Sequence, residues 1–389
     1  MWSKVANQLL YVSYLVAVVS ILLEVVLRIY NPLQPRLKND KIILPVNKRY
    51  EMTVDGLPLV NKNVLHTKNS LGFRGQEPPN DWNRHLTVLA VGGSTTECYF
   101  LSDGTDWPAV LTRQLRPALP NLWINNAGLN GHSTYGHQAL LDNYLLQLKP
   151  DIILFLIGIN DVGKDKMDGF DNALVRNAYV NLDGSWWKNT ARTIAQNSEL
   201  ISTVRLIIRG VKTQKLHYGD NMYTPLRPAD TLTLPPARIQ AELDSRKPYL
   251  KPYRERVQHL VTTCRKAGIE PVLITQPLLV GFARDSTTQT DLAKFRLHDT
   301  ENGELTWKRL EIYNVITREV AASQHVHLID LARELPKKGE YYYDEMHYTE
   351  AGANKVSSII AGDLGPYLKV KYGTAQAAKA RTAQAAKAR

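Results

Sequence analysis

Five short apolar runs, separated by longer helical stretches, constrain the fold of this chain more than any other feature. Continuous apolar runs bounded by glycine or proline are typical of parallel strands that are buried on both faces. Strands that alternate with helices predict one α/β/α domain, with helices on both sides of a parallel sheet. The runs cover residues 87–93, 123–128, 151–158, 271–277 and 325–331, and the helical stretches cover 107–116, 135–148, 253–267, 305–322 and 350–368.

Two connections are longer than a helical crossover requires. The interval from Asn160 to Pro271 predicts an insertion at about 163–250, which contains the adjacent residues Trp186 and Trp187. Such an insertion either covers the carboxyl ends of the strands, where open α/β sheets bind ligands, or packs as a structural excursion without contacting substrate. A second long connection, 281–303, is expected to form another wall near the same edge.

The composition excludes several classes of protein. The chain has 389 residues, of which 44% are hydrophobic and 22% charged, as in ordinary globular proteins. Its formal net charge is +11, but the cations concentrate in residues 28–49 and in the tail after Thr374. The body is nearly neutral, which argues against nucleic-acid binding. Two cysteines, Cys98 and Cys264, cannot form a disulfide framework or a four-thiolate zinc site, and we expect buried thiols, with a single disulfide as the alternative.

The N-terminal segment predicts a membrane anchor. Residues 9–27 read LLYVSYLVAVVSILLEVVL, with Glu24 as the only charge, and a helix of this length spans the apolar core of a bilayer. The alternative is a cleaved signal peptide, which requires small residues at the cleavage site. The bulky residues after Ser20 do not fit that requirement. Cation counting favours the cytoplasm for the basic side, whereas a terminal anchor usually exports the large domain that it precedes. The two arguments disagree on orientation, and we expect the large domain to be extracytoplasmic. The expected division is an anchor (1–30), a basic stem (31–68), the α/β domain (69–370) and a basic repeat tail (371–389).

Polar residues that can carry out chemistry follow the predicted strands. Ser94 follows the first run after two glycines, and a glycine-rich segment with Gly128 and Gly131 follows the second. Asn160 follows the third run. A fourth segment places a carboxylate and an imidazole three residues apart, Asp344 and His347, so that the acid can orient the ring.

These segments resemble the four sequence blocks of the SGNH/GDSL hydrolase superfamily, in the same chain order. The matching positions are Gly92–Ser94, Gly131, Gly158–Asp161 and Asp344–His347, and the segment NSLGFRG at 69–75 is also similar to one branch of that superfamily. The resemblance covers residues 69–368, with a poor match in the insertion. It implies a three-layer α/β/α sandwich around a five-stranded parallel sheet with the flavodoxin-like strand order.

The resemblance also implies residue roles in ester hydrolysis. Ser94 would be the nucleophile, His347 the general base and Asp344 its orienting partner. The amides of Ser94 and Gly131 and the side chain of Asn160 would form the oxyanion hole, with Gly128 as the alternative to Gly131. The sequence departs from the usual Gly-Asp-Ser block at Gly93, which leaves open the hydrogen bonds that the missing carboxylate normally makes.

Other candidate residues have structural interpretations. We expect His132 and His137 to lie on a loop or helix surface, Asp161 to cap a turn, and His325 and His327 to occupy edge positions on a strand. No H-E-x-x-H, paired C-x-x-C or G-x-G-x-x-G motif occurs at a suitable place, so neither a metal nor another cofactor is implied.

These observations favour a membrane-anchored serine esterase that removes an O-acyl group, for example acetyl, from a carbohydrate or another envelope component. An acyltransferase that acts on a polysaccharide would need the same site. A non-catalytic protein that binds envelope polysaccharide is the alternative from another class. The oligomeric state is not indicated by the sequence.

Overall fold

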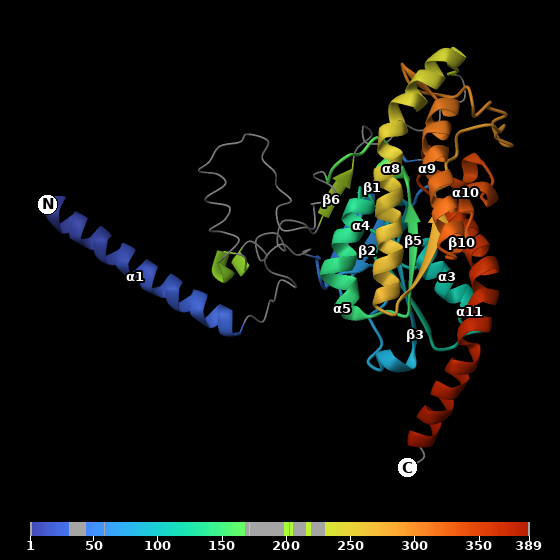
Figure 1. Cartoon of the computed structure of the whole chain (residues 1–389). Coiled ribbons are helices and arrows are strands. Elements are labelled where there is room, and N and C mark those ends of the chain that lie inside the picture. The colour runs from blue at the N-terminus through green and yellow to red at the C-terminus, as the bar shows by residue number, and fades with distance from the viewer. Residues whose placement is uncertain are drawn as a thin grey trace.

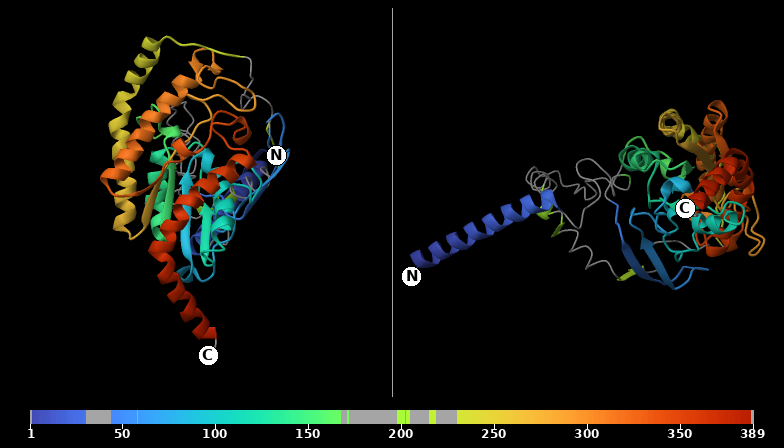
Figure 2. Two further views of the ribbon diagram at one scale, coloured as in Figure 1. Left: turned by 90° about the vertical axis from the view of Figure 1, so that its right-hand side faces the viewer. Right: turned by 90° about the horizontal axis from the view of Figure 1, so that it is seen from below.

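The computed structural model describes residues 2–30, 44–57, 59–167, 171, 198–201, 203–204, 215–218 and 230–387. In this part of the chain, helices enclose a central sheet, and helix α1 (Trp2–Ile29) lies apart from that body (Figures 1 and 2). Trp186, Trp187 and much of the expected insertion at 163–250 lie outside the described residues.

The central sheet has five strands in the order β10-β7-β5-β3-β4, and every neighbouring pair is parallel. Numbered along the chain, this is the 2-1-3-4-5 order of flavodoxin-like folds, so the expected fold class is confirmed. The strands are β3 (Leu86–Gly92), β4 (Leu122–Asn126), β5 (Ile152–Ile157), β7 (Glu270–Thr275) and β10 (His327–Ile329). Each lies within two residues of the run that predicted it.

Alternate residues of the strands enter two separate cores. In β3, Leu89 and Val91 belong to one cluster of buried residues, whereas Val88 and Ala90 belong to the other. The two faces are covered by different helices (Figure 1). The first is covered by α4 (Thr134–Leu140), α8 (Pro236–Lys266) and α9 (Gly303–Ser323), and the second by α3 (Trp107–Leu115) and α11 (Glu350–Lys387). Burial on both faces explains why these strands read as continuous apolar runs.

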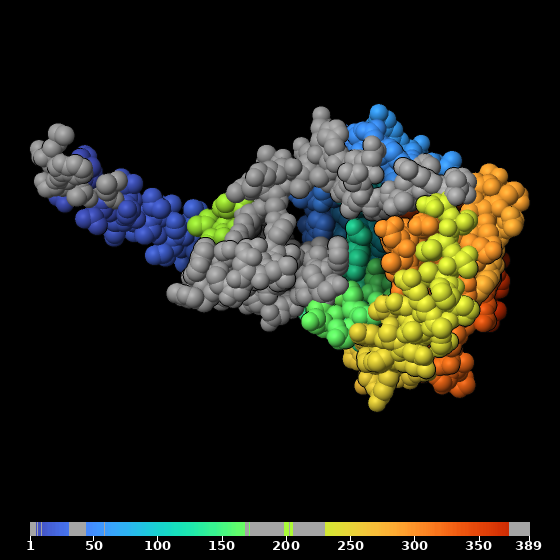
Figure 3. All heavy atoms as spheres, turned by 90° about the horizontal axis from the view of Figure 1, so that it is seen from above, coloured from blue at the N-terminus to red at the C-terminus, as the bar shows by residue number. Residues whose placement is uncertain are grey.

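A smaller sheet lies beside the central one and was not anticipated from the sequence. Strands β1 (Lys48–Val54) and β2 (Asn63–Lys68) form an antiparallel hairpin, and β6 (Lys215–Tyr218) pairs with β1 in parallel. Viewed from above, the blue atoms of the N-terminal hairpin and the yellow atoms of helix α8 lie toward opposite sides of the molecule (Figure 3). Part of the expected stem is therefore folded structure.

Strand β2 was not predicted from the sequence because of its composition. Its residues alternate between exposed and buried, but His66 and Lys68 share the buried face with Val64. Charged and titratable side chains on that face mask the pattern of a half-buried strand.

The helices differ from expectation mainly in length. Helix α8 begins at Pro236, well before the expected start at residue 253, although it contains Pro248 and Pro252. Helix α11 continues beyond residue 368 to Lys387. The expected helix 135–148 consists of α4, a π-helical turn (Leu141–Leu145) and α5 (Leu146–Leu148). The remaining short elements are α2 (Ser94–Glu97), β8 (Arg296–His298), β9 (Glu301–Asn302), α10 (Leu331–Glu334) and single turns at Trp82–Arg84, Ile159–Asp161 and Gly339–Tyr341.

Within α1, residues Leu10–Ile29 are long and apolar enough to cross a membrane. Their mean hydropathy is 2.4, and none of the span is buried against the rest of the protein. A signal sequence near the N-terminus also meets these criteria of length and composition.

Candidate active site

The carboxyl ends of the parallel strands lie at one edge of the central sheet, where the candidate residues meet. Strand β3 ends at Gly92, and Ser94 begins the short helix α2 immediately afterwards. Strand β5 leads to Asn160 in the turn Ile159–Asp161. Because parallel strands place their carboxyl ends together, residues from distant parts of the chain converge here.

Ser94, His347 and Asp344 form a continuous chain of hydrogen bonds. The Oγ of Ser94 lies 2.8 Å from Nε2 of His347, and Nδ1 of the same ring lies 2.6 Å from Oδ2 of Asp344. A proton on Nδ1 that is donated to the carboxylate leaves Nε2 as the acceptor of the serine hydroxyl proton. The structure therefore brings these three side chains together across 253 positions of the sequence.

Asp344 is buried, and its surroundings favour the charged form. Burial by itself raises the pKa of its carboxyl group. Attraction to His347, together with hydrogen bonds from the ring and from the amides of His347 and Met346, brings the pKa below its ordinary value. The two amides donate to Oδ1 at 2.6 and 2.8 Å, so both carboxylate oxygens have partners.

Tyr343 supports the imidazole from one face and was not identified from the sequence. Its ring is stacked on that of His347, with centroids 5.5 Å apart and an angle of 6° between the planes. Its neighbour on another side is Phe100, which lies edge-on at 6.2 Å. The position of Tyr343 just before Asp344 is the only signal of this role in the sequence.

The candidate oxyanion donors differ in whether their N–H groups are already used. The amide of Gly128 donates to Oδ1 of Asn126 at 2.9 Å, and its Cα packs directly against the backbone of α2. Gly131 has a φ of +73° and is partly exposed, and its amide makes no hydrogen bond within the described part of the chain. The amide of Ser94 is likewise unbonded among these residues. This difference favours Gly131 over Gly128.

Asn160 is held close to the serine turn. Its Nδ2 donates to the carbonyl oxygen of His132 at 3.0 Å, which leaves the second hydrogen of the amide for another acceptor. A Cβ atom at position 93 would overlap Nδ2 of Asn160 and lie 3.3 Å from the oxygen of His132. Gly93 therefore permits the close approach of Asn160, and the space of the usual aspartate is occupied by this amide.

His132 and His137 are not surface residues, contrary to expectation. Both are 1% exposed, and their rings lie 6.4 Å apart. Burial is the main reason that the pKa of His137 falls to about 3, so its ring is neutral at pH 7. His132 is therefore buried in the loop before α4, and His137 is buried within α4.

Asp161 has a structural role, but it does not cap its own turn. It is fully buried and accepts hydrogen bonds from the amide and hydroxyl of Thr134, at the start of α4, and from Arg256. Burial raises its pKa in spite of these partners. Asp171 similarly accepts the amide and hydroxyl of Ser133. These carboxylates fix the beginning of α4 and thereby the loop that precedes it.

His325 and His327 lie away from this edge, before and at the start of β10. Strand β10 is an edge strand, as expected, and His327 in it pairs with Asp363 at 2.5 Å, whereas His325 precedes the strand. Cys98 and Cys264 are free, buried thiols. Among the described residues, no group of three or more histidine, cysteine or carboxylate side chains is arranged to hold a metal ion.

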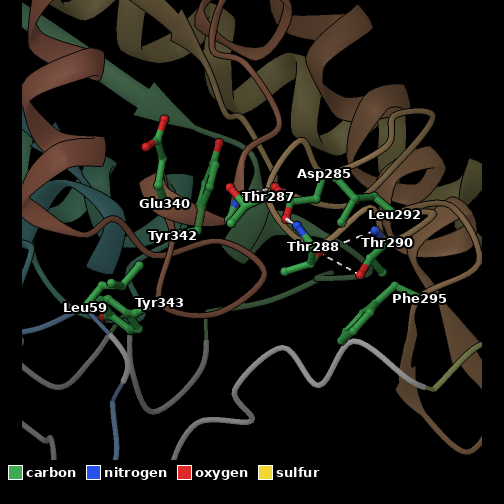
Figure 4. A pocket seen from close by; sticks show the side chains of 11 residues that line it. Leu59, Asp285, Thr287, Thr288, Thr290, Leu292, Phe295, Glu340, Tyr342 and Tyr343 are labelled. Carbon is green, nitrogen blue, oxygen red and sulfur yellow. Dashed lines mark hydrogen bonds between the residues drawn. The ribbon is translucent and has the colours of Figure 1, made fainter.

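A cavity of about 360 Å³ adjoins the candidate site through Tyr343 (Figure 4). The connection 281–303 contributes one wall, including Thr288, Thr290 and Phe295. Asp285 holds this wall in place, because its carboxylate accepts the amides of Thr288 and Gly339 at 2.8 Å each.

A fold of this kind, with a hydroxyl, an imidazole and a carboxylate joined at the carboxyl edge of its sheet, is the arrangement found in serine hydrolases. The model of the GDSL-like lipase/acylhydrolase family matches residues 90–355, which is more than half of the chain. The chain therefore belongs to this family of hydrolytic enzymes, and the resemblance noted in the sequence is confirmed. No curated protein shows significant sequence similarity to it.

The chain is also similar to several solved structures, all at low identity. An α/β hydrolase from the metagenome of Lake Arreo, Spain, is 16% identical with a TM-score of 0.40, over 72% of this chain and 96% of that one. An acetylxylan esterase from Geobacillus stearothermophilus is 15% identical with a TM-score of 0.38, over 72% and 93%. A lipolytic protein of the G-D-S-L family from Desulfitobacterium hafniense, described as putative, is 12% identical with a TM-score of 0.38, over 72% and 99%.

Proposed function

We propose that this acylhydrolase is a serine esterase in which Ser94 is the nucleophile, His347 the general base and Asp344 the residue that orients the imidazole. The observation that carries the proposal is the hydrogen-bonded chain from Ser94 Oγ through His347 to Asp344, at 2.8 and 2.6 Å. Ser94 and His347 are both partly exposed, so a substrate can reach them, whereas Asp344 is enclosed.

In the proposed reaction, Oγ of Ser94 attacks the ester carbonyl carbon while its proton passes to Nε2 of His347. The tetrahedral intermediate collapses, and the same proton passes to the leaving alcohol. Water then attacks the acyl-enzyme and gives its proton to His347, and release of the carboxylic acid restores the hydroxyl of Ser94. Asp344 stays ionised and stabilises the imidazolium in both halves of the reaction.

The oxyanion would accept hydrogen bonds from the amides of Ser94 and Gly131 and from Nδ2 of Asn160. The unbonded state of the two amides supports this assignment, as does the free hydrogen on Asn160. Each donor of this kind typically contributes about a hundredfold or more to turnover.

We further propose an O-acyl ester of a carbohydrate or another envelope component, for example an O-acetyl ester, as the substrate. The cavity beside Tyr343 supports this class, because aromatic rings and threonine hydroxyls line it together, and a sugar presents both C–H faces and hydroxyl groups. Helix α1 supports action at a membrane. We propose the extracytoplasmic side for the catalytic domain.

The direct test compares the full-length wild-type protein in detergent with Ser94→Ala on short-chain aryl esters. We expect the variant to lose nearly all turnover and to resist labelling by a fluorophosphonate probe, while its thermal unfolding is unchanged. Equal turnover in the two proteins would remove Ser94 from the mechanism.

A second measurement separates hydrolysis from acyl transfer. Products are analysed after incubation of an acyl donor with and without a hydroxyl-bearing acceptor sugar. An esterase gives free acid at the same rate in both, whereas an acyl sugar that accumulates at the expense of free acid identifies a transferase.

A further inference from the structure

A buried ion pair joins the N-terminal hairpin to the turn that bears Ser94. Lys68 at the end of β2 and Glu97 at the end of α2 are 5% and 6% exposed, and Nζ of Lys68 lies 2.6 Å from Oε1 of Glu97. Removing both charges from water is costly, and such a pair is often replaceable by apolar residues without loss of stability. The contact made by the second carboxylate oxygen of Glu97 suggests a role other than stability.

Oε2 of Glu97 accepts the backbone amide of Asn130 at 2.7 Å. Asn130 immediately precedes Gly131, whose amide makes no hydrogen bond among the described residues. One carboxylate therefore connects the hairpin to the loop that presents a proposed oxyanion donor. An amide that donates to a charged acceptor forms a stronger and better directed hydrogen bond than one that donates to a neutral group.

Lys68 is the cation that compensates this carboxylate. His66 lies 3.9 Å from Oε1, but burial first, and then the nearby charges of Arg74 and Lys68, hold its pKa well below the usual range, so its ring is neutral. The guanidinium of Arg74 donates to the backbone oxygens of Glu97 and Cys98 rather than to the carboxylate. Among the described residues, Lys68 is the one charged partner within 4 Å of the Glu97 carboxylate.

The same hairpin also reaches the histidine half of the site. Met52 and Val64 are buried in one cluster with Phe100 and Tyr343. Tyr343 is the residue that stacks on His347. The hairpin thus contacts the serine turn through an ion pair and the histidine loop through apolar packing.

We propose that Lys68 and Glu97 are positioning residues, which act through Asn130 to hold the backbone amide of Gly131 where it donates to the developing oxyanion. The proposal rests on the proposed function. The β1–β2 hairpin is on this view part of the active site, and not a passive stem between helix α1 and the enzyme.

The test uses two neutral double variants of the full chain, Lys68→Met with Glu97→Gln and Lys68→Met with Glu97→Leu. Both remove the buried charges, but only glutamine retains an oxygen that can accept the amide of Asn130. We expect the glutamine variant to keep kcat within about threefold of wild type, and the leucine variant to lose about tenfold or more. KM should be similar in both, because the oxyanion contact forms only in the transition state.

Lys62→Met is the matched control, since Lys62 lies on the same hairpin in an exposed pair with Asp55 at 3.0 Å. It should leave kcat unchanged. Equal kcat in the two double variants, whether high or low, overturns the proposal, because only glutamine offers an oxygen to the amide of Asn130. Ser94→Ala is measured in parallel. Wild-type turnover in that variant would instead refute the proposed function, independently of the double variants.

Discussion

Ser94 and His347 lie within hydrogen-bond distance, yet the segments that bear them are held by different kinds of interaction. His347 is oriented by Asp344, three residues earlier, whose carboxylate binds both the ring and the backbone of the same short loop. The serine turn is instead held by residues that are distant in the sequence. Arg74, from the segment before β3, donates to the carbonyls of Glu97 and Cys98, and Asn126, at the end of β4, donates to Thr96.

This contrast has an energetic consequence. A local loop can form its hydrogen bonds once a few residues are ordered, whereas the serine turn needs the hairpin, β3 and β4 to be in place. The buried polar groups around the turn are satisfied only in the complete fold, and an incomplete network would be costly. Substitutions in the histidine loop and in the serine turn should therefore have different effects on turnover and stability.

The largest effect is expected at the local half. Asp344→Asn should lower kcat about ten-thousandfold, because an amide cannot stabilise the imidazolium or select the productive tautomer. Steady-state kinetics measure this loss. Asp363→Asn is the control, since it neutralises the carboxylate of another Asp–His pair of similar length, which joins α11 to β10. A loss of less than tenfold for Asp344→Asn would show that the ring is oriented by other contacts.

A smaller loss of turnover is expected when one oxyanion donor is removed. Asn160→Ala should lower kcat about a hundredfold while KM stays near the wild-type value, because the bond is made chiefly in the transition state. It also frees the carbonyl of His132. A change confined to KM would instead place Asn160 in ground-state binding.

Gly93→Ala should cause part of the kcat loss that is expected for Asn160→Ala. The new methyl group would displace the amide of Asn160, so we expect about a tenfold loss in kcat, and little further loss when it is combined with Asn160→Ala. Gly362→Ala is the matched control, since no atom lies near its Cβ position, and alanine there should stabilise α11 by about 1 kcal/mol. Additive losses at positions 93 and 160 would contradict this coupling.

The smallest effect on turnover is expected for substitution of His137, which should change the pH dependence of stability instead. Its pKa falls from 6.5 to about 3 on folding, so the unfolded chain binds the extra proton between these values. The free energy of unfolding should therefore decrease as the pH falls through this interval, by at most about 1.4 kcal/mol per pH unit from this group. His137→Gln should flatten that dependence in denaturant titrations at pH 4 to 7, with kcat at pH 8 retained. An unchanged slope would show that His137 is not the group responsible.

Much of the central domain could be predicted from the sequence. The five strands were recognisable because burial on both faces requires continuous apolar runs. Ser94 was recognisable because it follows a run after two glycines, and Asp344 and His347 because a carboxylate and an imidazole stand three residues apart, in the block order of a known superfamily. The burial of His132 and His137 was not, since a histidine in a glycine-rich loop or in a short helix has no local feature that distinguishes burial from exposure. Strand β2 was missed because His66 and Lys68 occupy its buried face.

By itself, the sequence determined the period of the strands, the order of the reactive blocks and the local pairing of Asp344 with His347, all of which depend on neighbours within a few positions. Only the tertiary structure decided which glycine amide stays unbonded, why position 93 has no side chain, and which lysine compensates Glu97. These depend on contacts between segments tens of residues apart. Sequence spacing cannot specify such contacts, because the free energy of a buried polar group is set by its partners in space.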